Sequence, residues 1–309
     1  MNPLRKALQD YLGMRRGLGF KLQSQGRHLS NFIRFMEGRK AAYITTALAL
    51  EWAGQSNSAG SEQWYRLITL RPFAKYCSVA DSRTEVPPPN LIPRPRIRTR
   101  PYLYTEDEIQ RLLNAALNLR FKYDLKTYTH YCLFGLLAVS GLRIGEALRL
   151  KNEDVDLVNG VLNIRESKFG KSRLVPLHPT TQKVLNDYRS RRDRYLNGLT
   201  AAHFFISRRG TPLFHSDVNH IFNLLSVQVG LRDPSASHGP RLHDFRHRFA
   251  VWTLLRWYRS GEDIEPRLPL LSMYLGHTCI ANTYWYLTSC PELMALAVER
   301  LERRWEVEP

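Results

Sequence analysis

The chain has 309 residues and a mass of 36.0 kDa, a length that predicts about two domains. Apolar residues make up 43% of the chain and charged residues 24%, so the composition excludes an intrinsically disordered protein. Lysine and arginine outnumber aspartate and glutamate by 45 to 28. The resulting net charge of +17 favours a polyanionic partner, which is either nucleic acid or an anionic membrane surface.

The apolar segments argue against the membrane. The longest, residues 131–142, has about 12 residues, whereas a bilayer-spanning helix needs roughly 18 or more. The N-terminus runs into mixed polar sequence without the apolar core of a signal peptide, so we expect a cytoplasmic protein. The four cysteines form no CxxC pair and predict neither a disulfide framework nor a zinc ribbon.

The N-terminal quarter of the chain carries apolar residues at helical spacing. They form four groups between residues 4 and 77, which predict a helical bundle over residues 1–83. Residues 84–102 contain six prolines and predict an extended, semi-rigid linker. Four arginines alternate along it: Arg94, Arg96, Arg98 and Arg100. This linker is either a solvated tether or a segment that runs along a phosphate backbone.

The second predicted domain, residues 103–309, opens with a helix signal. Thr105-Glu-Asp-Glu108 has the spacing of a capping box and predicts a helix to about Leu119. An apolar helix should end near Ser140-Gly141, and a short helix should follow it over residues 143–150.

A small sheet is then predicted among helices. Residues 155–164 predict a hairpin about Asn159-Gly160, and residues 173–176 predict a third strand. Six more helices are expected near residues 179–195, 216–229, 242–258, 268–274, 281–287 and 291–305. The predicted fold class is therefore mainly α, with a small three-stranded antiparallel sheet.

Four segments of the second domain place polar residues among apolar ones. They are Ser140–Leu150 with Arg143, Ser167–Arg173 with Lys168, Arg241–His247 with His243 and Arg246, and Tyr274–His277, which lies nine residues before Tyr286. Each has a plain structural explanation as well. Arg143 could cap a helix or pair with Glu146. His243 and His247 have metal-ligand spacing, but Arg246 beside them would oppose a cation.

Taken together, the four segments resemble the active site of the tyrosine recombinases of the phage-integrase family. The match comprises Gly-Leu-Arg-x-x-Glu, a lysine turn between strands, His-x-x-Arg, Leu-Gly-His and the tyrosine nine residues further on. Residues 11–20 resemble the start of the family's helical core-binding domain. Residues 268–277 and 283–287 resemble members carried by integrated or transposon-like elements. The resemblance implies a helical core DNA-binding domain followed by a mixed α+β catalytic domain.

The resemblance implies catalytic roles for six residues: Arg143, Lys168, His243, Arg246, His277 and Tyr286. A phosphodiester under attack gathers negative charge on its nonbridging oxygens, and a guanidinium can donate two parallel hydrogen bonds to them. Tyrosine has a pKa near 10 and needs a base or an electropositive pocket to become a nucleophile. Lys168 would protonate the leaving 5′ oxygen. Tyr284 and Lys171 are the rival candidates for the nucleophile and the general acid.

The implied activity is site-specific recombination or integration through a 3′-phosphotyrosine intermediate, with no metal, ATP or other cofactor. The implied partners are duplex DNA at specific sites and further copies of the chain in a synaptic tetramer, located with the nucleoid. Companion recombinases or accessory proteins are left open. DNA contacts are also expected from the four linker arginines, Lys171 and Arg248. The alternatives are a type IB topoisomerase, which uses the same side-chain roles at one site, and a non-catalytic DNA-binding protein.

Overall fold

The computed structural model describes residues 3–55, 60–93, 101–119, 124–165, 172–236, 238–287 and 290–307. The chain divides between residues 99 and 100 into two compact units, called unit 1 and unit 2 below. The linker arginines Arg94, Arg96, Arg98 and Arg100 lie outside the described residues. The predicted domain limits therefore stay predictions. None of the helices in the described ranges is both long and apolar enough to cross a membrane.

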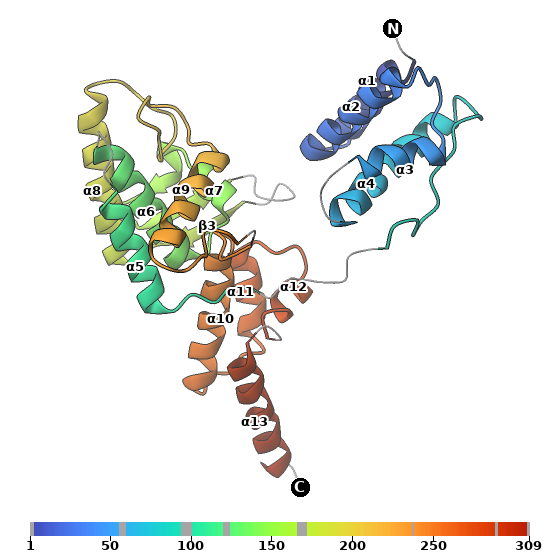
Figure 1. The fold of residues 1–309 in the computed structure, drawn as a ribbon. Helices are drawn as coiled ribbons and strands as arrows, with labels where there is room; N and C mark the ends of the chain where they lie inside the picture. Colours follow the sequence, from blue (N-terminus) through green and yellow to red (C-terminus); the bar gives the residue numbers. More distant parts are fainter. Residues whose placement is uncertain are drawn as a thin grey trace. The chain divides into compact units, whose positions relative to one another are not determined.

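Unit 1 contains the four predicted helices (Figure 1). They are α1 (Pro3–Gly17), α2 (Gln23–Gly38), α3 (Thr46–Gly54) and α4 (Gly60–Ser78). Their apolar faces form one core, in which Phe32, Trp52 and Phe73 are fully buried. The chain after α4 also packs on this unit, because the Glu85 amide donates to the Ile44 carbonyl oxygen at 2.8 Å. The start of the predicted linker therefore contacts unit 1.

Unit 2 is mostly helical and carries a small sheet, as Figure 1 shows. Its helices are α5 (Glu106–Leu117), α6 (Asp124–Ser140), α7 (Ile144–Arg149), the 3-10 turn η1 (Asn152–Asp154), α8 (Pro179–Leu196), α9 (His215–Gln228), α10 (Asp244–Arg259), α11 (Arg267–Leu275), α12 (Ala281–Tyr284) and α13 (Pro291–Val307). The strands β1 (Val155–Asp156), β2 (Val161–Ile164) and β3 (Arg173–Pro176) form an antiparallel sheet in the order β1-β2-β3. The predicted fold class is confirmed.

Local chemistry fixes the start of α5. The Glu108 amide donates to Thr105 Oγ1 at 3.2 Å, and the Thr105 amide donates to Glu108 Oε2 at 2.8 Å. These two bonds satisfy amide groups that the first helical turn leaves without partners. The predicted capping box is therefore present.

The hairpin between β1 and β2 turns at the predicted position. Gly160 has a φ of +67°, and a Cβ there would lie 2.1 Å from the Gln182 side chain. Glycine suits this position because it adopts a positive φ without steric cost, whereas a side chain would also displace Gln182. Strand β2 then pairs with β3 so that Leu162 lies opposite Val175, and both are buried. The sheet thereby closes one edge of the unit 2 core.

Helix α6 lies at the centre of unit 2, packed against α5, α8 and α10. Most of its side chains are apolar, and a helix that is apolar on all sides is buried. Leu133, Phe134 and Leu137 are fully buried. The helix ends at Gly141, whose φ is +61° and whose Cβ would come within 2.6 Å of the Phe249 ring. This tight ending directs the chain into the segment that carries Arg143.

The C-terminal helix α13 packs against α10 of its own unit. Leu293 is fully buried there. Arg259 pairs with Glu292, and Arg300 Nη2 lies 2.7 Å from Asp263 Oδ1. The Glu262 carbonyl oxygen also accepts from Arg300 Nη1 at 2.7 Å. The loop between α10 and α11 thus binds α13 through the Asp263 side chain and the Glu262 backbone.

Candidate active site

Arg143 lies where α6 has ended and α7 begins. Its amide donates to Glu146 Oε2 at 3.0 Å and its Nη1 donates to Glu146 Oε1 at 2.7 Å. The pairing considered from sequence is therefore real. Its Nη2 also donates to the Gly276 carbonyl oxygen at 3.3 Å, which brings Arg143 to the Leu-Gly-His turn 133 residues away. Arg143 thus has a fixed guanidinium that still retains 24% side-chain exposure.

Arg246, on the first turn of α10, is only 1% exposed. Its Nη1 donates to the Gly141 carbonyl oxygen at 2.9 Å, and its Nη2 donates to the Leu275 carbonyl oxygen at 2.5 Å. Burial and the nearby charge of Arg143 lower its pKa to about 10, so it remains protonated at neutral pH. Two positive guanidiniums therefore share one site.

His277 follows Gly276, which ends α11 in the left-handed conformation with a φ of +66°. Its Nδ1 lies 2.8 Å from Oγ1 of the fully buried Thr283. A substrate contact would therefore use Nε2. Burial, together with the charges of Arg246 and Arg143, lowers the pKa of His277 to about 4. The ring is neutral at neutral pH and can contact an anion only by hydrogen bonding.

Tyr286 lies in the same place and is 3% exposed. Its ring stacks on His277 with centroids 6.0 Å apart and meets the edge of His247 at 5.5 Å. Tyr284, the rival nucleophile, is 47% exposed. The structure therefore brings Tyr286, and not Tyr284, against the predicted site residue His277 and against His247.

His243 precedes α10, and its ring lies edge-on to His247 with centroids 4.7 Å apart. The residue is exposed, but nearby protein atoms displace water from part of its ring. This desolvation and the charge of Arg246 lower the pKa of His243 to about 4. A neutral imidazole of this kind can accept a proton.

Three other predicted positions remain. Lys168 and Lys171 lie outside the described residues. Arg248 is 9% exposed; its Nε donates to the Tyr104 carbonyl oxygen at 2.8 Å, and its guanidinium also pairs with Glu106. Arg248 therefore ties α10 to the start of α5, and this structural role competes with the predicted DNA contact.

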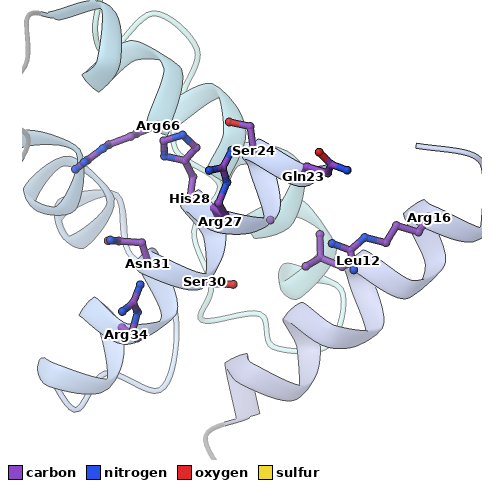
Figure 2. Close-up of a pocket in the computed structure, with 11 residues that line it drawn as sticks. Leu12, Arg16, Gln23, Ser24, Arg27, His28, Ser30, Asn31, Arg34 and Arg66 are labelled. Atoms are coloured by element: carbon purple, nitrogen blue, oxygen red, sulfur yellow. The ribbon is translucent and has the colours of Figure 1, made fainter. Parts of the chain in front are cut away.

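Unit 1 carries a separate basic cleft of about 760 Å³. Figure 2 shows its lining: Leu12 and Arg16 from α1, Arg66 from α4, and Gln23, Ser24, Arg27, His28, Ser30, Asn31 and Arg34 from α2. Gln23, Arg27 and Arg34 recur at helical spacing on the exposed face of α2, opposite the face that buries Phe32 and Met36. Glu62 lies beside the cleft, with its Oε1 3.5 Å from Arg66 Nε and 3.7 Å from His28 Nδ1.

Comparison with known proteins agrees with this geometry. Residues 103–292 match the phage integrase family. A protein of Sinorhizobium fredii named as an integrase/recombinase is 52% identical and covers 99% of both chains. This chain therefore belongs to the phage integrase family, the tyrosine recombinases, which are DNA strand-transfer enzymes.

Two solved structures share the fold. The Tn1549 transposon integrase, in complex with transposon right-end DNA, has a TM-score of 0.67 at 18% identity and covers 96% of this chain and 98% of its own. A lambda integrase tetramer bound to a Holliday junction has a TM-score of 0.55 at 18% identity and covers 89% and 77% of the two chains. The resemblance seen in the sequence is confirmed at the level of family and fold.

Sequence reasoning missed three residues that the structure adds to the site. Thr283 and His247 contact the predicted site side chains directly, and Arg173 pairs with Glu146. The sequence singles out His247 only by its metal-ligand spacing, and no group of three or more potential metal ligands occurs in the described ranges. A buried threonine six residues after His277 carries no signal of its own in the sequence.

The lowered pKa of His277 predicts a pH dependence of stability. Between about pH 6.5 and 4, the unfolded chain binds protons that the folded chain does not bind, so the free energy of unfolding falls as the pH falls. We predict that His277→Gln flattens this slope by up to about 1.4 kcal/mol per pH unit. Urea unfolding at several pH values measures it, and an unchanged slope would contradict the prediction.

We predict that Thr283 affects DNA cleavage by holding the His277 ring in its orientation. Thr283→Val keeps the side-chain shape but removes the hydroxyl, a loss of about 1 kcal/mol for one hydrogen bond. It should leave the imidazole free to rotate and slow DNA cleavage roughly tenfold. Thr283→Ser retains the hydroxyl and serves as the matched control, with cleavage close to the parent rate in a single-turnover assay. Equal rates for the two variants would show that the hydroxyl does not position His277.

Proposed function

We propose that this recombinase cleaves and rejoins duplex DNA at specific sites through a covalent bond between Tyr286 and a 3′ phosphate. The observation that carries the proposal is the arrangement around the buried Tyr286. Two guanidiniums fixed by backbone carbonyl oxygens lie in the same site as His277, whose ring stacks on that tyrosine. Positive charge that is already in place where negative charge develops often contributes more to catalysis than any other single effect.

The chemistry follows from these groups. The Tyr286 oxygen attacks phosphorus, its proton passes to the neutral His243, and the 5′ oxygen leaves with a proton from Lys168. Arg143 and Arg246 hold the nonbridging oxygens meanwhile. The phosphotyrosine bond preserves the ester, and a 5′ hydroxyl reverses the step during rejoining. The reaction therefore balances without ATP or a metal ion.

The burial of Tyr286 adds one requirement. At 3% exposure, its hydroxyl must be uncovered before a phosphate can approach it. It follows the four-residue helix α12, and its ring is held by contacts with His247 and His277. A four-residue helix has few backbone hydrogen bonds to break, so DNA binding can displace this segment at a modest cost in free energy.

Both units are proposed to bind DNA, with residues 1–83 as the core DNA-binding domain, 84–102 as the linker and 103–309 as the catalytic domain. The basic cleft of unit 1 supports this, because four arginines line it and only Arg66 among them has an ion pair with a carboxylate, that of Glu62, in the described residues. The charge of +17 agrees. The protein would act with the nucleoid in the cytoplasm, where this substrate lies.

We also propose that the chain assembles into a synaptic tetramer on two DNA sites, with or without companion recombinases or accessory proteins. The tetrameric lambda integrase complex supports this by its shared fold. Helix α13 supports it as well, because Met294 and Val298 remain exposed while Leu293 is buried on α10. An amphipathic helix with apolar residues left outside can contact a neighbouring subunit.

The nucleophile is tested by adduct formation. Tyr286→Phe should lose the covalent protein–DNA adduct on a suicide substrate that carries the element's end, because only the attacking oxygen is removed. DNA affinity should stay within about twofold. Tyr284→Phe is the matched control and should form adduct normally on a denaturing gel. Adduct with Tyr286→Phe but none with Tyr284→Phe would reverse the assignment.

Activity assays on the unmodified protein distinguish a recombinase from the two alternative functions. Recombinant product from two sites indicates a recombinase, whereas relaxation of supercoils without a specific site indicates a type IB topoisomerase. Intact DNA affinity with no adduct at all would indicate a non-catalytic DNA-binding protein.

Salt dependence tests the DNA contacts. Each phosphate contact adds about 0.9 to the slope of log affinity against log salt, so Arg27→Ala with Arg34→Ala should reduce the slope by about 2. Replacing Arg94, Arg96, Arg98 and Arg100 by alanine tests the linker in the same way. The control pair Arg5→Ala and Arg83→Ala removes equal charge from unit 1 outside the cleft and should leave the slope unchanged. If each of the three sets lowers the slope in proportion to the number of arginines removed, only net charge matters.

A further inference from the structure

Arg173 opens strand β3, and none of the roles described above uses it. Its side chain is 10% exposed, and each of its three guanidinium nitrogens is bonded to protein. Nη2 lies 2.8 Å from Glu146 Oε2, Nη1 donates to Glu146 Oε1 at 3.3 Å, and Nε donates to the Tyr274 carbonyl oxygen at 2.6 Å. Three of its five N–H donors are therefore bonded to protein, and its side chain is less exposed than that of Arg143, which retains 24% exposure.

Arg173 reaches Arg143 through Glu146. The Glu146 side chain is 1% exposed, and its Oε1 accepts hydrogen bonds from both arginines. Burial alone would raise the pKa of Glu146, but the arginines outweigh this and hold it at about 2. The carboxylate is therefore charged, and it fixes Arg143 in place.

A carboxylate that orients Arg143 also cancels its charge. With a single arginine partner, the pair would be neutral and would attract a phosphate weakly. Arg173 supplies a second positive charge, so Arg143, Glu146 and Arg173 together keep a net positive charge. Arg173 thus allows Glu146 to orient Arg143 without neutralising it.

The same guanidinium packs on the turn that carries His277. A Cβ at Gly276 would lie 2.9 Å from Arg173 Nη1, so only glycine leaves room for the arginine. The Gly276 carbonyl oxygen in turn accepts from Arg143 Nη2. Arg143 and Arg173 therefore share a carboxylate and flank the same glycine.

We propose that Arg173 is a positioning residue for Arg143. It acts through Glu146 to hold the Arg143 guanidinium in its orientation and to preserve its positive charge for the scissile phosphate, without touching DNA. The inference rests on the proposed function, because it assumes that Arg143 binds that phosphate during cleavage.

A double-mutant cycle on single-turnover cleavage of the suicide DNA tests the proposal. Arg173→Gln should slow cleavage roughly 10- to 100-fold, because Arg143 loses orientation and charge. In an Arg143→Ala background the same change should cost less than about threefold, because the group it positions is absent. An equal cost in both backgrounds would overturn the proposal. Should Arg173→Gln fail to fold, Arg173→Lys, which keeps the charge without the planar fork, completes the same cycle.

Arg192→Gln is the matched control. Arg192 is also an almost fully buried arginine of unit 2, with bonds to Asp193, Asn152 and the Phe204 carbonyl oxygen, none of which belongs to the site. Its loss should lower the unfolding midpoint but change cleavage by the same factor in both backgrounds. This comparison separates a general loss of packing from an effect that passes through Arg143.

Charge compensation has its own readout. Glu146→Gln added to Arg173→Gln removes the negative charge that now cancels Arg143 but keeps an amide oxygen that can accept from Arg143 Nη1, so the double variant should cleave several-fold faster than Arg173→Gln alone. A slower double variant would overturn the compensating role. Adduct formation by the unmodified protein is measured separately, and its absence would reject the proposed function. If the unmodified protein cleaves normally but the effects of Arg173→Gln and Arg143→Ala are additive, only the role of Arg173 is rejected.

Discussion

The buried guanidinium of Arg246 is the constraint on which the site depends. A charge at 1% exposure is costly unless hydrogen bonds compensate it, and the carbonyl oxygens of Gly141 and Leu275 provide them. Those carbonyls end α6 and α11, which carry the approaches to Arg143 and His277. Because one side chain satisfies both helix ends, the two chain segments that supply the site are held at a fixed separation.

The electrostatics of the site follow from this arrangement. Arginines concentrate positive charge in a partly dry space, and that charge together with burial keeps His243 and His277 neutral, with pKa values near 4. The permanent positive charge therefore resides on guanidiniums, which cannot lose a proton at working pH, while the neutral imidazoles can accept a proton or donate a hydrogen bond. Glu146 partly offsets the charge of Arg143. Its second partner, Arg173, keeps the net charge of the three groups positive.

Much of unit 2 was predictable because its signals are local. The capping box at Thr105 and the turn at Gly160 depend on residues within a few positions of each other, and both formed as expected. The end of α12 was less predictable. The sequence predicts a helix over residues 281–287, yet α12 ends at Tyr284, and Tyr286 packs on His247 and His277.

The sequence by itself determined the fold class, the family and the set of polar side chains whose order indicates phosphoryl transfer. The tertiary structure decided which of them meet and what holds them. Arg173 bonds to a carbonyl oxygen 101 residues away, Arg143 to one 133 residues away, and Arg248 is buried against Tyr104 from 144 residues away. No spacing rule encodes such contacts, because they arise only when separate helices pack and their buried polar groups must find partners.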